Sequence, residues 1–344
     1  MKDHHSKNRD KDDELYKTFL SETKQELKDT HSFSEEEQRK ILKVGRNTAR
    51  NTTIMISLAI LLLIMPVLTL MTYMYYGFGG KADQLIDIVS KTVYVTEPNT
   101  SLEEMEIEDE IGIFSMHVLF DTYKRIGKED YKAENYDVYF GLDQPDFPKK
   151  NSFLERPLPK GYSVEVERLL HPDATIPFDE DGEWEILKNL PDGTVAEAYV
   201  SLTELMEPDD LEKLVPEETE VRWLAVDTGL EAKQVDSEEV PITSIGYPAQ
   251  IDATTWSPFN GRDQSNEEVF IDILELLEKN EDMAEKVSRA KSLEIKQRLA
   301  YIKENGIKVY GAVITGPTPE LRKLETINKI RAVKVGEVKL WNWN

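Results

Sequence analysis

NTTIMISLAILLLIMPVLTLMTYMYYG occupies residues 51–77 and contains no Asp, Glu, Lys, Arg or His, although 31% of the chain is charged. Residues 53–76 would rise about 36 Å as a helix, which exceeds the hydrocarbon core of about 30 Å. A core helix of this length would normally show a polar stripe. A cleaved signal peptide has a shorter apolar run close to the start. We therefore predict an uncleaved transmembrane helix over 53–76.

The positive charge that flanks this span is uneven and predicts its orientation. Five basic residues lie just before it, at Arg39, Lys40, Lys43, Arg46 and Arg50. Just after it only Lys81 and Lys91 occur, among acidic residues. Basic residues stay on the cytoplasmic side of single spans. We expect residues 1–52 in the cytoplasm, residues 77–344 outside, and the protein in the cell membrane.

The charge and the amino-acid composition exclude several classes of function. Residues 1–52 hold 12 Lys and Arg against 11 Asp and Glu, so the net charge of −24 comes from the part after the span. That acidic part lacks the basic face that displaces counterions from nucleic acid. The chain has no cysteine, which excludes disulfides and thiolate metal sites. No cofactor and no metal site are predicted.

The N-terminal arm shows two helical patterns. In 13–27 the apolar residues follow helical spacing, and a capping box of Ser34 with Glu37 predicts a second helix. The arm has no core of its own, so we expect the apolar faces to bind a partner. The alternatives are that the helices pack on each other or lie on the membrane. The candidate binding residues are Leu15, Tyr16, Phe19, Leu20, Leu27, Phe33, Ile41 and Leu42.

The part after the span alternates strand and helix patterns. The strands are expected at 92–95, 111–120, 195–202, 220–229, 308–316 and 331–341, and the helices at 183–190, 208–214, 265–280, 281–305 and 318–327. Residues 178–184 suggest a turn. Ser265 or Asn266 can cap the helix over 265–280, and Thr318 suggests the N-cap of the helix over 318–327. This predicts an α+β extracytoplasmic domain with two β-α-β-like units and added helices. We divide it into a membrane-proximal region, 77–180, and a C-terminal regulatory domain, 181–344.

Motifs of known enzyme classes do not occur in the chain. No H-E-x-x-H, G-x-S-x-G or zinc spacing is found. Histidine catalysis outside the cell would have to rest on His117 or His171 alone. We expect a protein that is not an enzyme. The alternative is a membrane-anchored envelope enzyme or binding module whose arm only sets the topology, because a carboxylate pair is possible in so acidic a domain.

Several stretches together resemble the sigma factor regulator family, the membrane-bound anti-sigma factors of the anti-sigma-M type from Bacillus-like bacteria. They are YYGFGGKAD, LPDGTVAEAYVSL, VRWLAVDTG, SIGYPAQ, KVYGAVITGPTPEL and VGEVKLWNWN. The resemblance implies that the arm sequesters an extracytoplasmic-function sigma factor of the sigma-M type and releases it on envelope stress. It leaves room for a small membrane co-regulator. The absence of cysteine implies a zinc-free contact with the sigma factor.

Overall fold

Helix α2 (Glu35–Gly77) contains the whole apolar stretch and also the second helix of the arm. In this computed structural model neither Gly45 nor Pro66 interrupts it. Among the residues that the structure describes, one helix is long and apolar enough to cross a membrane, and it begins at Glu35. None of its most apolar window is buried, unlike a core helix of a soluble protein.

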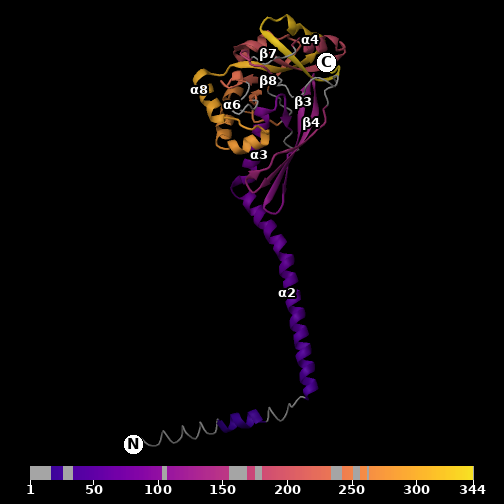
Figure 1. Cartoon of the computed structure of the whole chain (residues 1–344), viewed down its shortest axis with the longest axis vertical. Coiled ribbons are helices and arrows are strands. Elements are labelled where there is room, and N and C mark those ends of the chain that lie inside the picture. Colours follow the sequence, from indigo (N-terminus) through magenta and orange to yellow (C-terminus); the bar gives the residue numbers. More distant parts are fainter. Residues whose placement is uncertain are drawn as a thin grey trace, which may run out of the picture. The chain divides into compact units, whose positions relative to one another are not determined.

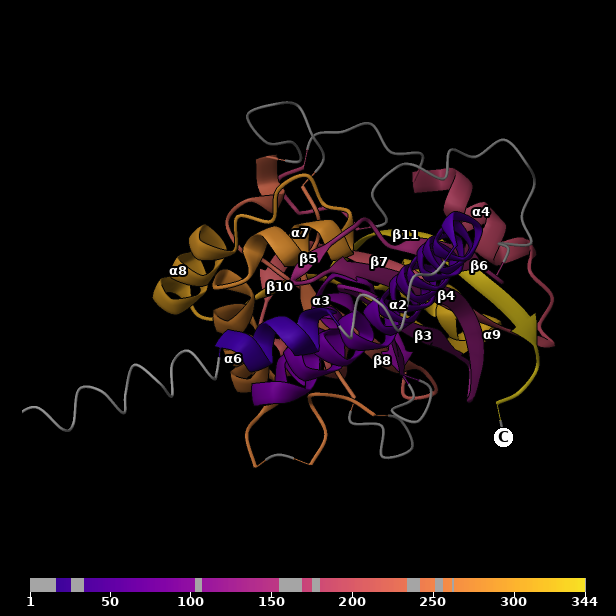
Figure 2. The ribbon, with the colours of Figure 1, turned by 90° about the horizontal axis from the view of Figure 1, so that it is seen from below.

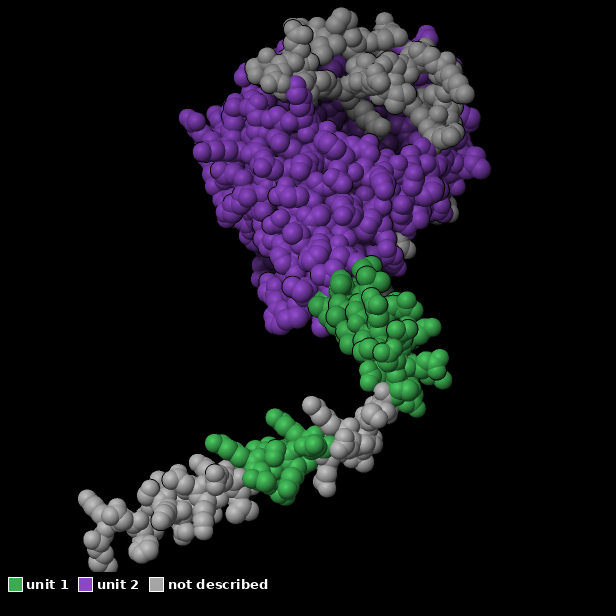
Figure 3. Space-filling model, turned by 60° about the horizontal axis from the view of Figure 1, so that its bottom comes forward, with its two compact units in different colours: residues 1–67 green, residues 68–344 purple. Residues whose placement is uncertain are grey.

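The structure describes residues 17–25, 34–102, 107–154, 169–174, 180–233, 242–250, 256–261 and 263–343. The chain divides into two compact units, Met1–Val67 and Leu68–Asn344, which Figure 3 shows in different colours. The strands named below all belong to the second unit. That unit is an α+β structure, in agreement with the fold class expected from the sequence.

Two antiparallel sheets make up the strands of the second unit. The first has the order β1 (Ser101–Leu102), β3 (Ser115–Ile126), β4 (Glu129–Gly141), β5 (Gln144–Pro145), with β2 (Glu108–Ile111) beside β3 and β6 (Lys149–Ser152) beside β4. The second has the order β11 (Ile330–Leu340), β7 (Thr194–Met206), β10 (Val309–Pro317), β8 (Glu220–Val226), β9 (Gly246–Pro248).

The second sheet has the strand order of a split β-α-β arrangement. β7 and β8 are both antiparallel to β10, so they run in the same direction with β10 between them, and α5 (Pro208–Leu214) connects them in sequence. β10 and β11 flank β7 in the same way, and α9 (Thr318–Arg322) follows β10. Two interleaved units of this kind form the ferredoxin-like pattern.

The remaining helices cover the sheets. They are α3 (Lys81–Thr96), α4 (Glu180–Asn189), α6 (Asn266–Glu278), α7 (Glu281–Ser288) and α8 (Ile295–Asn305), with 3₁₀ turns η1 (Phe78–Gly80), η3 (Glu231–Lys233) and η4 (Lys323–Thr326). Figures 1 and 2 show α6 and α8 together at one side of the second sheet and α4 at the other. Ser265, one of the two cap candidates in the sequence beside Asn266, caps α6, and the structure adds a complete capping box with Glu268.

Five local predictions are wrong. The strand expected over 111–120 is interrupted by a turn, since β2 ends at Ile111 and β3 begins at Ser115. Residues 92–95 lie in α3, because Leu85, Val89 and Val93 are buried at helical spacing, and this burial outweighs the β-propensity of the run. Residues 180–184 begin α4 instead of forming a turn. The helix expected over 281–305 is broken after Ser288, where Arg289 and Glu294 adopt positive φ. Thr318 is the first residue of α9 and does not cap it.

One continuous apolar core joins both sheets to the helices. It includes Met116 and Val118 of β3 as well as Ala198 and Val200 of β7. Polar groups also bridge the sheets inside the unit. Glu197 Oε1 lies 3.0 Å from Lys124 Nζ of β3 and accepts a hydrogen bond of 2.9 Å from Asn99 Nδ2. Two sheets that share a core and a buried ion pair behave as one body.

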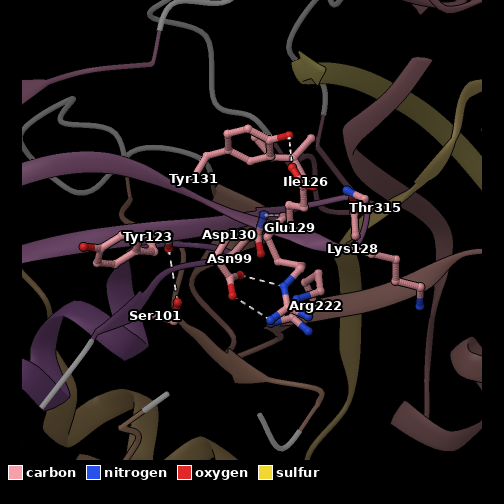
Figure 4. A network of polar contacts seen from close by, with 12 residues as sticks. Asn99, Ser101, Tyr123, Ile126, Lys128, Glu129, Asp130, Tyr131, Arg222 and Thr315 are labelled. Atoms are coloured by element: carbon pink, nitrogen blue, oxygen red, sulfur yellow. Dashed lines mark hydrogen bonds and ion pairs between the residues drawn. The ribbon is translucent and has the colours of Figure 1, made fainter. Parts of the chain in front are cut away.

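The turn between β3 and β4 is fastened to the second sheet. Gly127 N–H donates to Thr315 Oγ1 of β10 at 2.7 Å. We call the contacts of this turn with the second sheet and with Asn342 the seam, and Figure 4 shows the surrounding polar network from close by. Asn342, which follows β11, donates to the Ile126 carbonyl at 2.8 Å and accepts from Lys128 N–H at 3.1 Å. These contacts connect the first strands of the unit to the segment that follows its final strand.

Candidate functional site

The helix at residues 17–25 presents apolar side chains to solvent. Phe19 is 67% exposed and Leu20 is 42% exposed. The hydroxyls of Ser21 and Thr23 donate back to the carbonyls of Thr18 and Phe19, at 2.8 and 2.6 Å. The polar groups of this short helix are therefore satisfied locally, whereas its apolar side chains have no cover. Leu15, Tyr16, Leu27 and Phe33 lie outside the described residues.

The first turns of α2 carry the remaining candidates. The predicted capping box is present, since Ser34 N–H donates to Glu37 Oε2 at 3.0 Å and Glu37 N–H donates to Ser34 Oγ at 3.3 Å. Ile41 is 54% exposed and Leu42 is 72% exposed. The structure thus leaves all four described candidates open: Phe19 and Leu20 are neighbours on one helix, and Ile41 and Leu42 on the other.

A basic segment precedes the apolar span and includes Ile41 and Leu42. Its five charges, at Arg39, Lys40, Lys43, Arg46 and Arg50, are all exposed. Within this segment the structure gives Arg39 an ion pair with Glu35, at 3.9 Å. Such an exposed pair contributes little to stability, about 0–1 kcal/mol. The segment is therefore available to headgroups or to a partner.

The end of α2 holds two residues that sequence reasoning missed. Thr72 and Tyr76 are fully buried, although their neighbours on the helix are exposed. Thr72 Oγ1 accepts from Phe114 N–H at 2.9 Å, and the Tyr76 hydroxyl donates to the Leu142 carbonyl at 2.7 Å. No local pattern singles these two out, because other hydroxyl residues of the same helix are also four residues apart.

An abrupt change of direction follows α2. Gly79 and Gly80 both have positive φ, at 76° and 67°, a conformation that glycine adopts without steric cost. The charged Lys81 then begins α3, whose apolar face packs in the core of the second unit. The stretch YYGFGGKAD, quoted above for the family resemblance, therefore contains the bend between α2 and α3.

The two histidines considered for catalysis have separate local partners. His117 Nδ1 lies 2.7 Å from Asp137 Oδ1 on the first sheet. His171 is buried, and its Nδ1 accepts from Asp173 N–H at 3.2 Å. A cleft of about 400 Å³ between α3, the β4–β5 turn and the α6–α7 turn is lined by neither of them. Within the described residues no group of three or more His, Cys, Asp or Glu could hold a metal ion.

Asp227, just after β8, is the centre of a buried polar cluster. Its Oδ2 accepts from the Tyr301 hydroxyl at 2.8 Å, and its Oδ1 accepts from Gly229 N–H at 3.0 Å and lies 3.5 Å from His171 Nε2. Burial raises the pKa of Asp227, but the bonds from His171, Tyr301 and Gly229 outweigh it and hold the pKa below its ordinary value. The bond to Asp227, together with burial, raises the pKa of Tyr301 to about 12. The cluster joins Tyr301 of α8 to the residue that follows β8.

Comparison with known proteins gives one consistent result. Residues 39–131 match the family model described as sigma factor regulator N-terminal, and residues 187–337 match sigma factor regulator C-terminal. The chain is 29% identical over 320 residues to the probable anti-sigma-M factor YhdL of Bacillus subtilis (strain 168), which covers 91% of this chain and 86% of that protein. No solved structure matches.

Each match covers a defined series of helices and strands. The N-terminal match begins in α2 and ends in β4, and the C-terminal match runs from the end of α4 into β11. The resemblance drawn from the sequence motifs is confirmed, and it extends through residues 84–131, where the motifs gave little support. With models of both parts matching in order, the chain belongs to the sigma factor regulator family.

Proposed function

We propose that this protein is a membrane-tethered anti-sigma factor whose N-terminal segment binds a sigma factor of the extracytoplasmic-function, sigma-M type. The observation that carries the proposal is the exposure of Phe19, Leu20, Ile41 and Leu42 on helices that have no core of their own. Exposed apolar side chains at helical spacing are what a helix-in-groove contact requires. The name of the Bacillus relative supports the choice of partner.

The topology belongs to the same proposal. The five basic residues before the span favour a cytoplasmic N-terminal segment, and the acidic second unit then lies outside the cell. The span, residues 53–76, tethers the bound sigma factor to the membrane and keeps it from core RNA polymerase. Envelope stress sensed by the second unit releases it, alone or with a small membrane co-regulator. A shift of about 1.4 kcal/mol in binding free energy changes the affinity tenfold.

The test is co-purification of the full-length protein, in detergent micelles, with tagged sigma factors from the same genome. The triple variant Phe19→Ala, Ile41→Ala, Leu42→Ala should weaken binding strongly, since a single truncated apolar anchor at an interface costs about 2 kcal/mol, roughly a 30-fold loss of affinity. The matched control is Lys24→Ala with Lys40→Ala, which changes exposed polar residues on the same two helices.

Stoichiometric recovery of one sigma factor, lost in the triple variant and kept in the control, is the expected result. Failure of every sigma factor to bind the intact protein would overturn the proposal. Binding that is kept in the triple variant and lost in the control would show that charge, and not the apolar face, holds the partner. That result would contradict the assignment of the apolar candidates to the binding site.

A further inference from the structure

Two turns of the first sheet lie against the end of α2. The β2–β3 turn carries Ile113 and Phe114, and the β4–β5 turn carries Leu142. We call these three residues the apolar tips. The turns contact α2 through the two hydrogen bonds described above, from Phe114 N–H to Thr72 and from Tyr76 to the Leu142 carbonyl. All of these residues belong to the second unit.

The side chains of the apolar tips point away from the core. Ile113 is 37% exposed, Phe114 is 44% exposed and Leu142 is 39% exposed. Phe114 and Leu142 also have positive φ, at 53° and 62°, where turns usually place Gly or Asn. Bulky apolar residues at such positions are strained, and strain of this kind collects at functional positions.

The backbone at the tips is hydrogen-bonded, although its side chains are open. Phe114 N–H donates to Thr72, the Phe114 carbonyl accepts from Leu142 N–H at 3.1 Å, and the Leu142 carbonyl accepts from Tyr76. Gly112 N–H donates to the Ser115 carbonyl at 2.9 Å. At Phe114 and Leu142 the side chain is apolar and the backbone N–H and C=O are bonded within the protein or to α2. This is what contact with hydrocarbon requires, because lipid offers no hydrogen bonds.

The depth of this contact follows from the helix itself. Thr72 precedes the end of α2 at Gly77 by five residues, which is about 7–8 Å along a helix axis. At the same level Leu70, Met71 and Met74 are exposed on the other faces of α2. If those side chains contact lipid, the Phe114 backbone held at Thr72 lies at the same depth.

We infer that the apolar tips insert into the lipid bilayer, in the leaflet where α2 leaves the membrane. This surface continues the apolar surface of α2, and a charged pair bounds it, since Lys81 Nζ at the start of α3 lies 3.5 Å from Asp143 Oδ2 beside Leu142. The ligand is the headgroup and upper acyl region of phospholipid. The second unit therefore rests on the membrane at three points, α2 and two turns, and this inference depends on the proposal that α2 spans the membrane.

The experiment uses the absence of cysteine from the chain. Single variants Ile113→Cys, Phe114→Cys and Leu142→Cys of the full-length protein carry a nitroxide spin label in nanodiscs of phosphatidylcholine and phosphatidylglycerol. For each label we compare two collision rates of the nitroxide: that with oxygen, which concentrates in lipid, and that with a nickel chelate, which stays in water. Met71→Cys serves as the lipid reference and Leu340→Cys, at the exposed end of β11, as the water reference.

Labels at the tips should resemble Met71→Cys, with several-fold more oxygen collision relative to nickel than Leu340→Cys. Ile113→Cys keeps the test valid if Phe114→Cys disturbs its turn, because Ile113 has no positive φ. If the tip labels collide with oxygen and nickel as Leu340→Cys does, while Met71→Cys stays lipid-like, this inference is overturned and the membrane tether is not. Shielding from both reagents would overturn it too, since protein and not lipid would then cover the tips. A water-exposed Met71→Cys would overturn both this inference and the membrane tether.

Discussion

Arg298 of α8 is a buried cation whose loss the second unit should not tolerate. Its side chain is 1% exposed. Nε donates to the Leu293 carbonyl at 2.6 Å, and Nη2 donates to the Thr243 carbonyl at 2.9 Å. Nη1 lies 2.7 Å from Glu231 Oε1 and 3.1 Å from Thr228 Oγ1. One guanidinium thus connects α8 to η3 and to the segment before β9.

The variant Arg298→Met keeps the apolar stem and removes every one of these donors. Glu231 would remain buried without its cation, and two carbonyls would lose a partner. Removal of one member of a buried pair costs about 3–5 kcal/mol. We therefore expect the free energy of unfolding of the full-length protein in micelles to fall by that amount. Urea denaturation followed by tryptophan fluorescence measures it, because all five tryptophans lie in the second unit.

The matched control is Lys303→Met on the same helix. Its ion pair with Glu275, at 2.6 Å, is about half exposed on both sides, so its loss should cost under about 1 kcal/mol. In the double variant Arg298→Met, Glu231→Gln the buried charge is gone, and part of the stability should return. A loss for Arg298→Met no larger than that for Lys303→Met would refute the reasoning.

Three further predictions concern single residues. Tyr301→Phe removes a hydrogen bond to the ionised Asp227 and should lower the free energy of unfolding by about 1.5–3 kcal/mol at pH 7. The lowered pKa of Asp227 stabilises the fold fully only above the pKa that this group has in the unfolded chain. The difference in unfolding free energy between variant and wild type, measured in urea, should therefore shrink below about pH 4. Burial raises the pKa of Glu337, so Glu337→Gln should stabilise the fold at pH 7, and this gain in the same denaturation assay should vanish below about pH 4. Asn342→Ala should lower the thermal midpoint, because the turn after Ile126 loses its bonds and about 1–2 kcal/mol.

Sequence reasoning located the elements whose pattern is local. The apolar span, the capping boxes at Ser34 and Ser265 and the four long strands of the second sheet needed no tertiary information. The wrong predictions occur where tertiary packing, and not the local sequence pattern, determines the secondary structure. Residues 92–95 are three β-branched residues and a tyrosine, yet they lie in α3, where all four are buried. The break after Ser288 depends on a left-handed residue, Arg289, that no motif marks.

Some residues of the candidate site could be predicted from local spacing, and others could not. Helical spacing identified Phe19, Leu20, Ile41 and Leu42, and the structure leaves each of them open. What such side chains bind is not a property of the free helix, so no single-chain pattern could identify the partner. The contacts of Thr72 and Tyr76 pair residues 42 and 66 positions apart. Periodicity within a short window cannot reveal pairings over that distance.

The seam at Asn342 has a consequence for how the chain is made. Asn342 bonds to Ile126 across 216 positions, and such distant contacts slow folding because a long loop must close first. During synthesis the β3–β4 hairpin emerges long before Asn342, so these bonds to its turn form only after residue 342 has been made. A chain interrupted before Asn342 would lack the bonds from this residue to Ile126 and Lys128. Its β3–β4 turn would then depend on the bond to Thr315, so a protease should cut that turn more readily than in the finished protein.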